Sequence, residues 1–186
     1  MSKPIRIYLA APFKRKEEAK EARTKLQEAG FVVTSRWIDF SGEELDYNST
    51  DDFPVFQEQA VNDVTDIANA DVLVMLNLEY SEGKMFELGL ATAAGKACII
   101  VGNRSHTFHF LNYPVVGDVE TAIELIRQWE NVRDDFSKQI EDLVDVHKRA
   151  LSVGDLATSI AIKDELLSKY NVVLDDVTGG TQWRVQ

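Results

Sequence analysis

The sequence predicts an α/β fold in which a doubly wound parallel sheet is followed by a C-terminal helical extension. Short apolar segments alternate with amphipathic segments up to about residue 120, and this alternation is typical of parallel βαβ units. Residues 72–76 are only Val, Leu and Met, which suits a strand buried on both faces of a sheet. From about Glu130 the chain becomes acidic with helical periodicity, which predicts the extension.

The first part of the chain is expected to contain five strands and four helices. The expected strands are 5–10, 31–34, 72–77, 97–101 and 115–116. The expected helices are 14–29, 55–69, 85–95 and one that starts near residue 118. Residues 35–54 show no regular pattern, and an irregular segment of this length in a compact domain is usually functional.

The chain is expected to divide into a domain of residues 1–129 and an extension of residues 130–186. In the extension, apolar side chains recur at helical spacing, and Gly154 marks a break before a second helix that runs to about Tyr170. The last segment, 172–186, contains many turn-forming residues and is expected to be turn-rich.

The composition excludes several classes of function. The formal net charge is −11, which argues against general binding of nucleic acids or of anionic membranes. The single cysteine, Cys98, lies in an apolar run, so we expect a buried structural thiol, no internal disulfide and a reducing, cytoplasmic setting. We expect neither a signal peptide nor a membrane-spanning segment.

Neither a metal nor a cofactor is expected. The three histidines, His106, His109 and His147, do not have the spacing of a zinc site. The sequence also lacks a Walker motif and the Gly-x-Gly-x-x-Gly fingerprint, which argues against nucleoside triphosphatases and dinucleotide dehydrogenases.

Glu87 is the most informative side chain, because it is the only charge among residues 85–95. Its neighbours are apolar on nearly every side, which predicts a buried helix. A carboxylate in such a helix normally has a partner or a function. A glutamate near a helix N-terminus is also favoured by the helix dipole, so a structural role stays open.

Asp63 is a second carboxylate on an expected apolar face. In the helix 55–69 it shares this face with Ala60 and Ile67, whereas Asp66 is expected on a more polar face. Asp63 is either a paired or rim residue, or it lines a site.

Glu87 and Asp63 can reach the same crevice, because ligands bind outside the carboxyl ends of the strands in such sheets. Two carboxylates there suggest acid/base or glycosyl-transfer chemistry. Tyr8 lies in the middle of the first strand, and a core role is its alternative. Ser81 precedes the expected helix, where it can be the N-cap or a phosphate ligand.

Three ordered motifs resemble the nucleoside 2-deoxyribosyltransferase family. They are Ile7-Tyr8-Leu9-Ala10-Ala11-Pro12-Phe13, then Asn62-Asp63 with Ile67 and Ala70-Asp71, then Gly83-Lys84-Met85-Phe86-Glu87-Leu88-Gly89. The resemblance covers residues 4–127. It implies a flavodoxin-like fold and cleavage of the N-glycosidic bond of 2'-deoxynucleosides. It also implies that Glu87 is the nucleophile, that Tyr8 orients Glu87, and that Asp63 contacts the base and helps to protonate it.

One position departs from the transferase pattern. Transferases often have an acidic residue six positions before the nucleophile, and this chain has Ser81 there. The pattern Ser81-x-Gly83-x-x-Phe86-Glu87 is more similar to the related 2'-deoxynucleoside 5'-phosphate N-hydrolases, in which a serine binds the 5'-phosphate. Two reactions therefore stay open, namely transfer of the sugar to a second base and its transfer to water.

The expected substrate is a small deoxynucleoside or deoxynucleotide. Besides the catalytic residues, seven residues are expected to contact this substrate. They are Ser81, Gly83, Ala11, Pro12, Phe13, Arg36 and Trp37. Members of the family usually complete their site with a neighbouring chain, so a homo-oligomer is expected.

The C-terminal segments 161–167 and 172–184 are similar to the end of cysteinyl-tRNA synthetases. From Glu130 onward, 7 Lys or Arg stand against 11 Asp or Glu, a net of −4, which favours a packing or oligomer module over RNA binding. Two other functions stay open: a non-catalytic nucleotide-sensing or RNA-associated module, and an NAD glycohydrolase.

Overall fold

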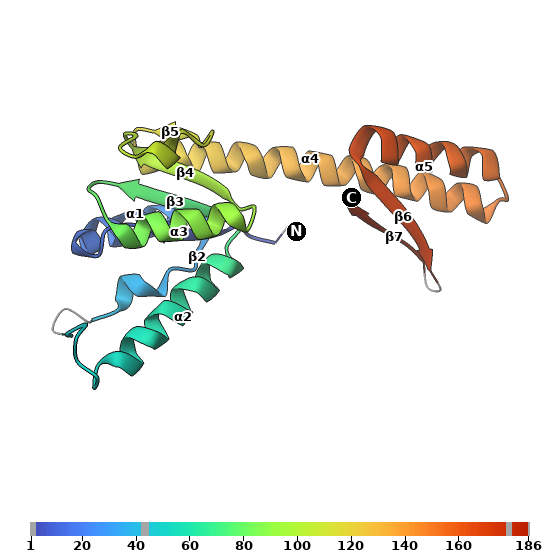
Figure 1. The fold of residues 1–186 in the computed structure, drawn as a ribbon. Coiled ribbons are helices and arrows are strands. Elements are labelled where there is room, and N and C mark those ends of the chain that lie inside the picture. Colours follow the sequence, from blue (N-terminus) through green and yellow to red (C-terminus); the bar gives the residue numbers. More distant parts are fainter. Residues whose placement is uncertain (1–2, 42–44, 178–179, 186) are drawn as a thin grey trace. The chain divides into compact units, whose positions relative to one another are not determined.

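A five-stranded parallel sheet forms the centre of the first unit of the chain (Figure 1). The computed structural model describes residues 3–41, 45–177 and 180–185. The strands are β1 (Arg6–Ala10), β2 (Val32–Val33), β3 (Val72–Asn77), β4 (Ala97–Gly102) and β5 (Val115–Val116). Their order across the sheet is β2-β1-β3-β4-β5, and every pairing is parallel. This is the flavodoxin-like order, so the predicted fold is confirmed.

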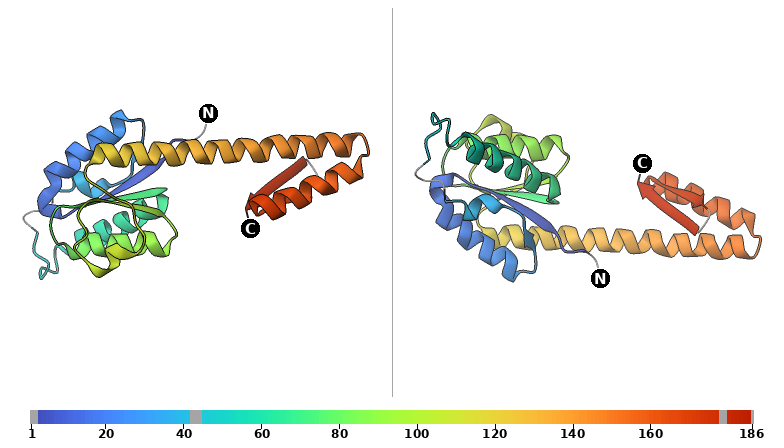
Figure 2. Two further views of the ribbon diagram at one scale, coloured as in Figure 1. Left: turned by 90° about the horizontal axis from the view of Figure 1, so that it is seen from above. Right: turned by 90° about the horizontal axis from the view of Figure 1, so that it is seen from below.

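Helices cover both faces of this sheet (Figure 2). On one face lie α1 (Lys16–Glu28) and the first turns of α4 (Val119–Ser152), and on the other lie α2 (Phe53–Asn69) and α3 (Glu82–Ala93). Short 3-10 helices follow three strands: η1 (Phe13–Arg15), η2 (Arg36–Asp39) and η3 (Thr107–Phe110). Because both faces are covered, β3 is buried from its first residue to its fifth.

Helix α3 is buried on one side only, so the prediction of a helix buried nearly all round is wrong. Leu88 and Ala91 are buried, whereas Phe86 is 67 % exposed. The helix belongs to the outer layer, where one face packs on the sheet and the opposite face meets solvent.

The predicted faces of α2 also need correction. Asp66 is buried together with Ile67, although Asp66 was expected on a polar face, and Ala60 is exposed. Asp66 tolerates burial because Arg36 pairs with it, with an Nη2–Oδ1 distance of 2.8 Å.

Residues 128–186 form a second compact unit, and residues 1–127 form the first. Helix α4 continues from the first unit into the second, so the boundary expected at residue 129 lies within a helix. The second unit also contains α5 (Leu156–Tyr170), β6 (Val172–Val177) and β7 (Gly180–Val185).

Strands β6 and β7 form an antiparallel hairpin, so the prediction of a turn-rich end is wrong for the described residues. Val172 and Leu174 are buried in a core with side chains of α4 and α5. Their spacing is the strand period, and β-branched and aromatic residues favour strands over turns. Thr178 and Gly179, two of the expected turn residues, lie outside the described residues.

Cys98 is buried, as predicted. Burial raises the pKa of its thiol, which suits a structural role. Among the described residues, no helix combines the length and the apolar character that crossing a membrane requires.

Candidate active site

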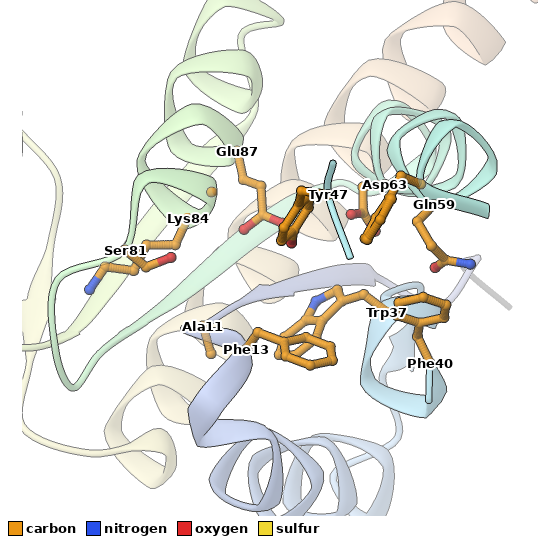
Figure 3. A pocket seen from close by; sticks show the side chains of 12 residues that line it. Ala11, Phe13, Trp37, Phe40, Tyr47, Gln59, Asp63, Ser81, Lys84 and Glu87 are labelled. Carbon is orange, nitrogen blue, oxygen red and sulfur yellow. The ribbon is translucent and has the colours of Figure 1, made fainter. Parts of the chain in front are cut away.

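A pocket of about 240 Å³ lies beyond the carboxyl ends of β1, β2 and β3 (Figure 3). Helix α3 supplies one of its sides and α2 the opposite side. The lining residues are Ala11, Phe13, Trp37, Phe40, Tyr47, Phe56, Gln59, Asp63, Ser81, Gly83, Lys84 and Glu87. The pocket lies where ligands bind in doubly wound sheets, beside the point at which the strand order reverses between β1 and β3.

Glu87 points into the pocket from the second turn of α3, and Tyr8 holds it in place. The Tyr8 hydroxyl donates to Glu87 Oε1 at 2.6 Å. Burial and the neighbouring carboxylates raise the pKa of the Tyr8 phenol, so this hydroxyl remains a donor. Burial, together with the charge of Asp63, raises the pKa of Glu87 to about 8.

Asp63 faces the same pocket from α2 (Figure 3). Burial and then the charge of Asp66 raise the pKa of Asp63 to about 6, while Tyr8 and Arg36 act in the opposite direction. Asp63 Oδ1 and Glu87 Oε2 are buried, and neither has a hydrogen-bond partner within the described residues. Such atoms are rare in folded proteins, and here both lie where a ligand can satisfy them.

Aromatic rings form two walls of the pocket. On one wall Tyr47 and Phe56 stack with 4.3 Å between ring centroids. On the other, Phe13 lies 6.5 Å from Trp37 and 6.3 Å from Phe40. The Trp37 indole is fixed, because its Nε1 donates to a backbone carbonyl of β1 at 2.8 Å. Flat apolar walls with a few polar groups suit a planar heterocyclic ring.

Ser81 and Gly83 line the pocket where α3 begins. Ser81 occupies the N-cap position, yet its hydroxyl makes no capping hydrogen bond. The alternative of Ser81 as a simple N-cap is therefore not supported. Ser81 directly precedes the first turn of α3, and the amides of a helix N-terminus favour an anionic group of a ligand.

The pocket brings together most of the predicted site residues. Those that line it are Ala11, Phe13, Trp37, Asp63, Ser81, Gly83 and Glu87. Tyr8 acts on the pocket through Glu87. Pro12 and Arg36 are not among its lining residues, because Pro12 is the N-cap of η1 and the Arg36 guanidinium turns to the buried Asp66.

Lys84 and Gln59 line the pocket but were not predicted. Lys84 is 2 % exposed, and its Nζ donates to Asn77 Oδ1 at 2.5 Å and to the carbonyl of Glu79. Burial lowers the pKa of Lys84, and its ammonium anchors the turn before α3. A lysine in the first turn of a mostly apolar helix was one available signal. The spacing of Gln59, one helical turn before Asp63, was another.

Within residues 3–41, 45–177 and 180–185, no group of three His, Cys, Asp or Glu side chains could hold a metal ion. Two of the histidines lie in the loop after β4 and bind backbone amides. His109 Nδ1 accepts from the amide of Ser105 at 3.1 Å, and His106 Nδ1 accepts from that of Phe108 at 3.3 Å.

The family model for nucleoside 2-deoxyribosyltransferase matches residues 7–149, which is more than half of the chain. The chain belongs to the nucleoside 2-deoxyribosyltransferase family. The match includes all elements that line the pocket, so the resemblance of the three sequence motifs is confirmed at the level of the family.

Two solved structures from this group of enzymes are similar to the chain. The CMP N-glycosidase BcmB of Clostridium botulinum is 19% identical, with 66% of this chain and 98% of that chain covered and a TM-score of 0.44. A 2-deoxyribosyltransferase of Bacillus psychrosaccharolyticus is 21% identical, with 63% and 90% covered and a TM-score of 0.45. A comparison with curated protein sequences gave no match.

Proposed function

We propose that the protein cleaves the N-glycosidic bond of 2'-deoxynucleosides or their 5'-monophosphates, with Glu87 as the nucleophile. The observation that carries this proposal is the state of the Glu87 carboxyl group. Tyr8 holds Oε1 at 2.6 Å, while Oε2 is buried and has no partner among the described residues. Membership of the family supports the type of bond that is cleaved.

In the first step, a Glu87 oxygen attacks C1' of the deoxyribose while the bond from C1' to the base nitrogen breaks. The base leaves with the bonding electron pair and takes a proton from the Asp63 carboxyl group. The products are a glycosyl ester on Glu87, the neutral base and an Asp63 carboxylate. Asp63 is suited to donate this proton, because its raised pKa lies closer to neutrality than that of an ordinary carboxyl group.

In the second step, water or a second base attacks C1' of the ester. Glu87 leaves as a carboxylate, and the proton lost by the attacking group returns to Asp63. Attack by water gives hydrolysis, and attack by a base gives transfer of the sugar. Both outcomes use the same first step and the same side chains.

The protonation of the pair suits this sequence. Burial raises the pKa of both carboxyl groups, and the negative charge of Asp63 further disfavours ionisation of Glu87. At neutral pH the pair holds about one proton, and the pKa of about 8 places this proton on Glu87 while Asp63, with a pKa of about 6, is mostly ionised. Positive charge that develops at C1' favours the ionised form of Glu87, so the proton of Glu87 passes to Asp63 as substrate binds and from Asp63 to the leaving base.

The rest of the pocket suits a nucleoside or nucleotide. A base can lie between the aromatic walls with its glycosidic bond near Glu87 and Asp63. The 5' group can then reach Ser81 and the start of α3, where a phosphate would accept hydrogen bonds.

Base release is the direct test. The protein is incubated with each common deoxynucleoside and deoxynucleoside monophosphate, with and without a second free base, and products are separated by chromatography. Exchange of bases without free sugar selects transfer. Release that requires the monophosphate selects nucleotide hydrolysis.

Two variants of α3 complete this test. Glu87→Gln should abolish release and exchange, whereas Glu82→Gln, at an exposed position of the same helix, should retain both. Base release that survives Glu87→Gln would contradict the proposed nucleophile.

We also propose that the enzyme is a cytoplasmic homo-oligomer that acts on small molecules, without nucleic acid or membrane partners. Membership of the family and the acidic composition support this proposal. Size-exclusion chromatography with light scattering measures the assembly, and a monomer at all concentrations would contradict it.

A further inference from the structure

An ion pair beside the pocket joins the segment after β2 to helix α2. Arg36 Nη2 lies 2.8 Å from Asp66 Oδ1, and Arg36 Nε donates to the two carboxylate oxygens at 2.9 and 3.1 Å. The backbone amide of Arg36 donates to Asp66 Oδ2 at 3.0 Å. Three N–H groups thus converge on one carboxylate whose side chain is 8 % exposed, which gives the pair a fixed geometry.

Each partner of this pair is directly connected to a pocket residue. Trp37 follows Arg36 in η2 and forms part of one aromatic wall. Asp63 precedes Asp66 by three residues on α2, so the two carboxylates lie on the same side of the helix. The pair therefore connects the wall at Trp37 with the helix face that carries Asp63.

We propose that Arg36 and Asp66 are positioning residues of the reaction. Their ion pair fixes Trp37 and Asp63 relative to each other, and its two charges balance each other beside the proposed acid. This inference rests on the proposed function for the role of Asp63 as an acid. The effect of the Arg36 and Asp66 charges on the titration of Asp63 is independent of the proposed function, because these charges act on Asp63 whatever the substrate is.

The groups that face Asp63 come from four elements. They are Tyr8 of β1, Arg36 of η2, Asp66 of α2 and Glu87 of α3. Lys84 of α3 lines the same pocket, but its ammonium is bound by Asn77 and Glu79. The charge of Asp66 raises the pKa of Asp63, and the charge of Arg36 lowers it.

The two partners can therefore be separated by opposite changes. Arg36→Gln leaves the charge of Asp66 unbalanced, so Asp63 should lose its proton at higher pH than in the wild type. Asp66→Asn leaves the charge of Arg36 unbalanced, so Asp63 should lose its proton at lower pH. The double variant carries neither charge and should titrate between the two single variants. A purely structural role would move both single variants in the same direction.

The titration of Asp63 is measured by NMR on protein labelled with 13C at aspartate carboxyl groups, with Asp63→Asn for assignment. The pH profile of kcat/KM for base release is recorded on the same variants. Arg23→Gln is the matched control, because Arg23 binds Asp39 at the other end of η2 at 2.7 Å. It loosens the same segment without a charge change beside Asp63, so the titration should not move.

Single variants that shift Asp63 in the same direction, or not at all, would overturn the inference. The inference would also be overturned if Arg23→Gln shifted the titration of Asp63 as far as Arg36→Gln does. Absence of base release by the wild type would refute the proposed function, and the NMR titration would still decide the electrostatic role of the pair.

Discussion

The pocket of the first unit and a polar cluster in the second unit both bury titratable side chains. The two regions differ in whether the polar atoms of these side chains have hydrogen-bond partners. In the second unit, His147 and Ser159 are buried. His147 Nδ1 lies 3.1 Å from the Ser159 hydroxyl, and His147 Nε2 lies 3.1 Å from Asp176 Oδ1. Asp176 also accepts from Lys163 at 2.5 Å and from Thr181 at 2.7 Å.

The cluster contains a serine, a histidine and an aspartate in hydrogen-bond contact, as catalytic triads do. Its histidine and its aspartate take their hydrogen-bond partners from within the second unit. The donors around Asp176, led by Lys163 and Thr181, lower the pKa of its carboxyl group. In the pocket, by contrast, Asp63 Oδ1 and Glu87 Oε2 have no partner in the described chain, and their pKa values are raised. Polar groups that pair with one another stabilise a fold, whereas buried polar atoms without a partner are ready for a ligand.

The largest expected effect is on activity at the unpaired site. Glu87→Gln should lower base release by about a thousandfold or more, because the amide cannot form the glycosyl ester. The rate is measured by chromatography of the released base. A loss of less than tenfold would show that the unpaired oxygen is not the nucleophile.

Asp63→Asn should come next, with a loss of about a hundredfold, since an amide cannot deliver a proton to the leaving base. The dependence of kcat/KM on pH should lose the limb that reports this group. A substrate whose base leaves without protonation should be affected much less, and an equal loss for both substrates would contradict the role of Asp63 as an acid.

The two regions should also differ in the sign of their pH dependence. The folded state holds the Glu87 proton up to about pH 8, while the unfolded chain releases it near its ordinary value of 4.5, so stability falls as pH rises through this window. Glu87→Gln should remove this loss of stability, which is on the order of a few kcal/mol, and should raise Tm at pH 9 more than at pH 5.

The pKa of Asp176 is lowered, so the contribution of this residue to the stability of the folded state is fully present above pH 3.8. This contribution is lost as the pH falls below that value. Calorimetry across pH would contradict the comparison if Glu87→Gln and Asp176→Asn changed Tm with the same sign at pH 7.

His147→Leu should destabilise the second unit by about 2 kcal/mol, because Asp176 and Ser159 lose a buried partner. Urea unfolding measures the change. The exposed variant Lys148→Leu, at the next position of α4, is the matched control and should change stability much less. Activity of the folded enzyme should be retained, and a loss of kcat in His147→Leu would show that the cluster also serves the site.

The smallest expected effect is at Ser81. Ser81→Ala should raise KM for a monophosphate by roughly tenfold, the loss of one hydrogen bond to a charged group, and leave kcat almost unchanged. The corresponding nucleoside is the control substrate and should show little change. Equal effects on both substrates would exclude the 5'-phosphate as the partner of this hydroxyl.

The parts of the fold and site that could be predicted depend on local patterns. Buried strands such as β3 are continuous apolar runs, and Glu87 is conspicuous because its sequence neighbours carry no charge. The burial of Asp66 could not be predicted in this way, because it depends on Arg36, which lies 30 positions away in the sequence. The same contact turns the Arg36 guanidinium to Asp66, so Arg36 lies outside the lining of the pocket in which it was expected.

The hairpin of the second unit was missed for a related reason. Its glycines and aspartates are typical of turns when they are considered alone. The strands form because Val172 and Leu174 bury their side chains against α4 and α5, which is a property of the assembled unit. Local propensity for strands depends on such context more than propensity for helices does.

The hydrogen bond from Tyr8 to Glu87 joins residues that are 79 positions apart in the chain. Strand β1 must dock beside β3 before this hydroxyl reaches the carboxylate, and closing so long a loop is slow compared with forming helices. A partly folded chain therefore cannot orient Glu87 through Tyr8, however much helix it has formed. During refolding, the proposed cleavage would begin only when the sheet closes.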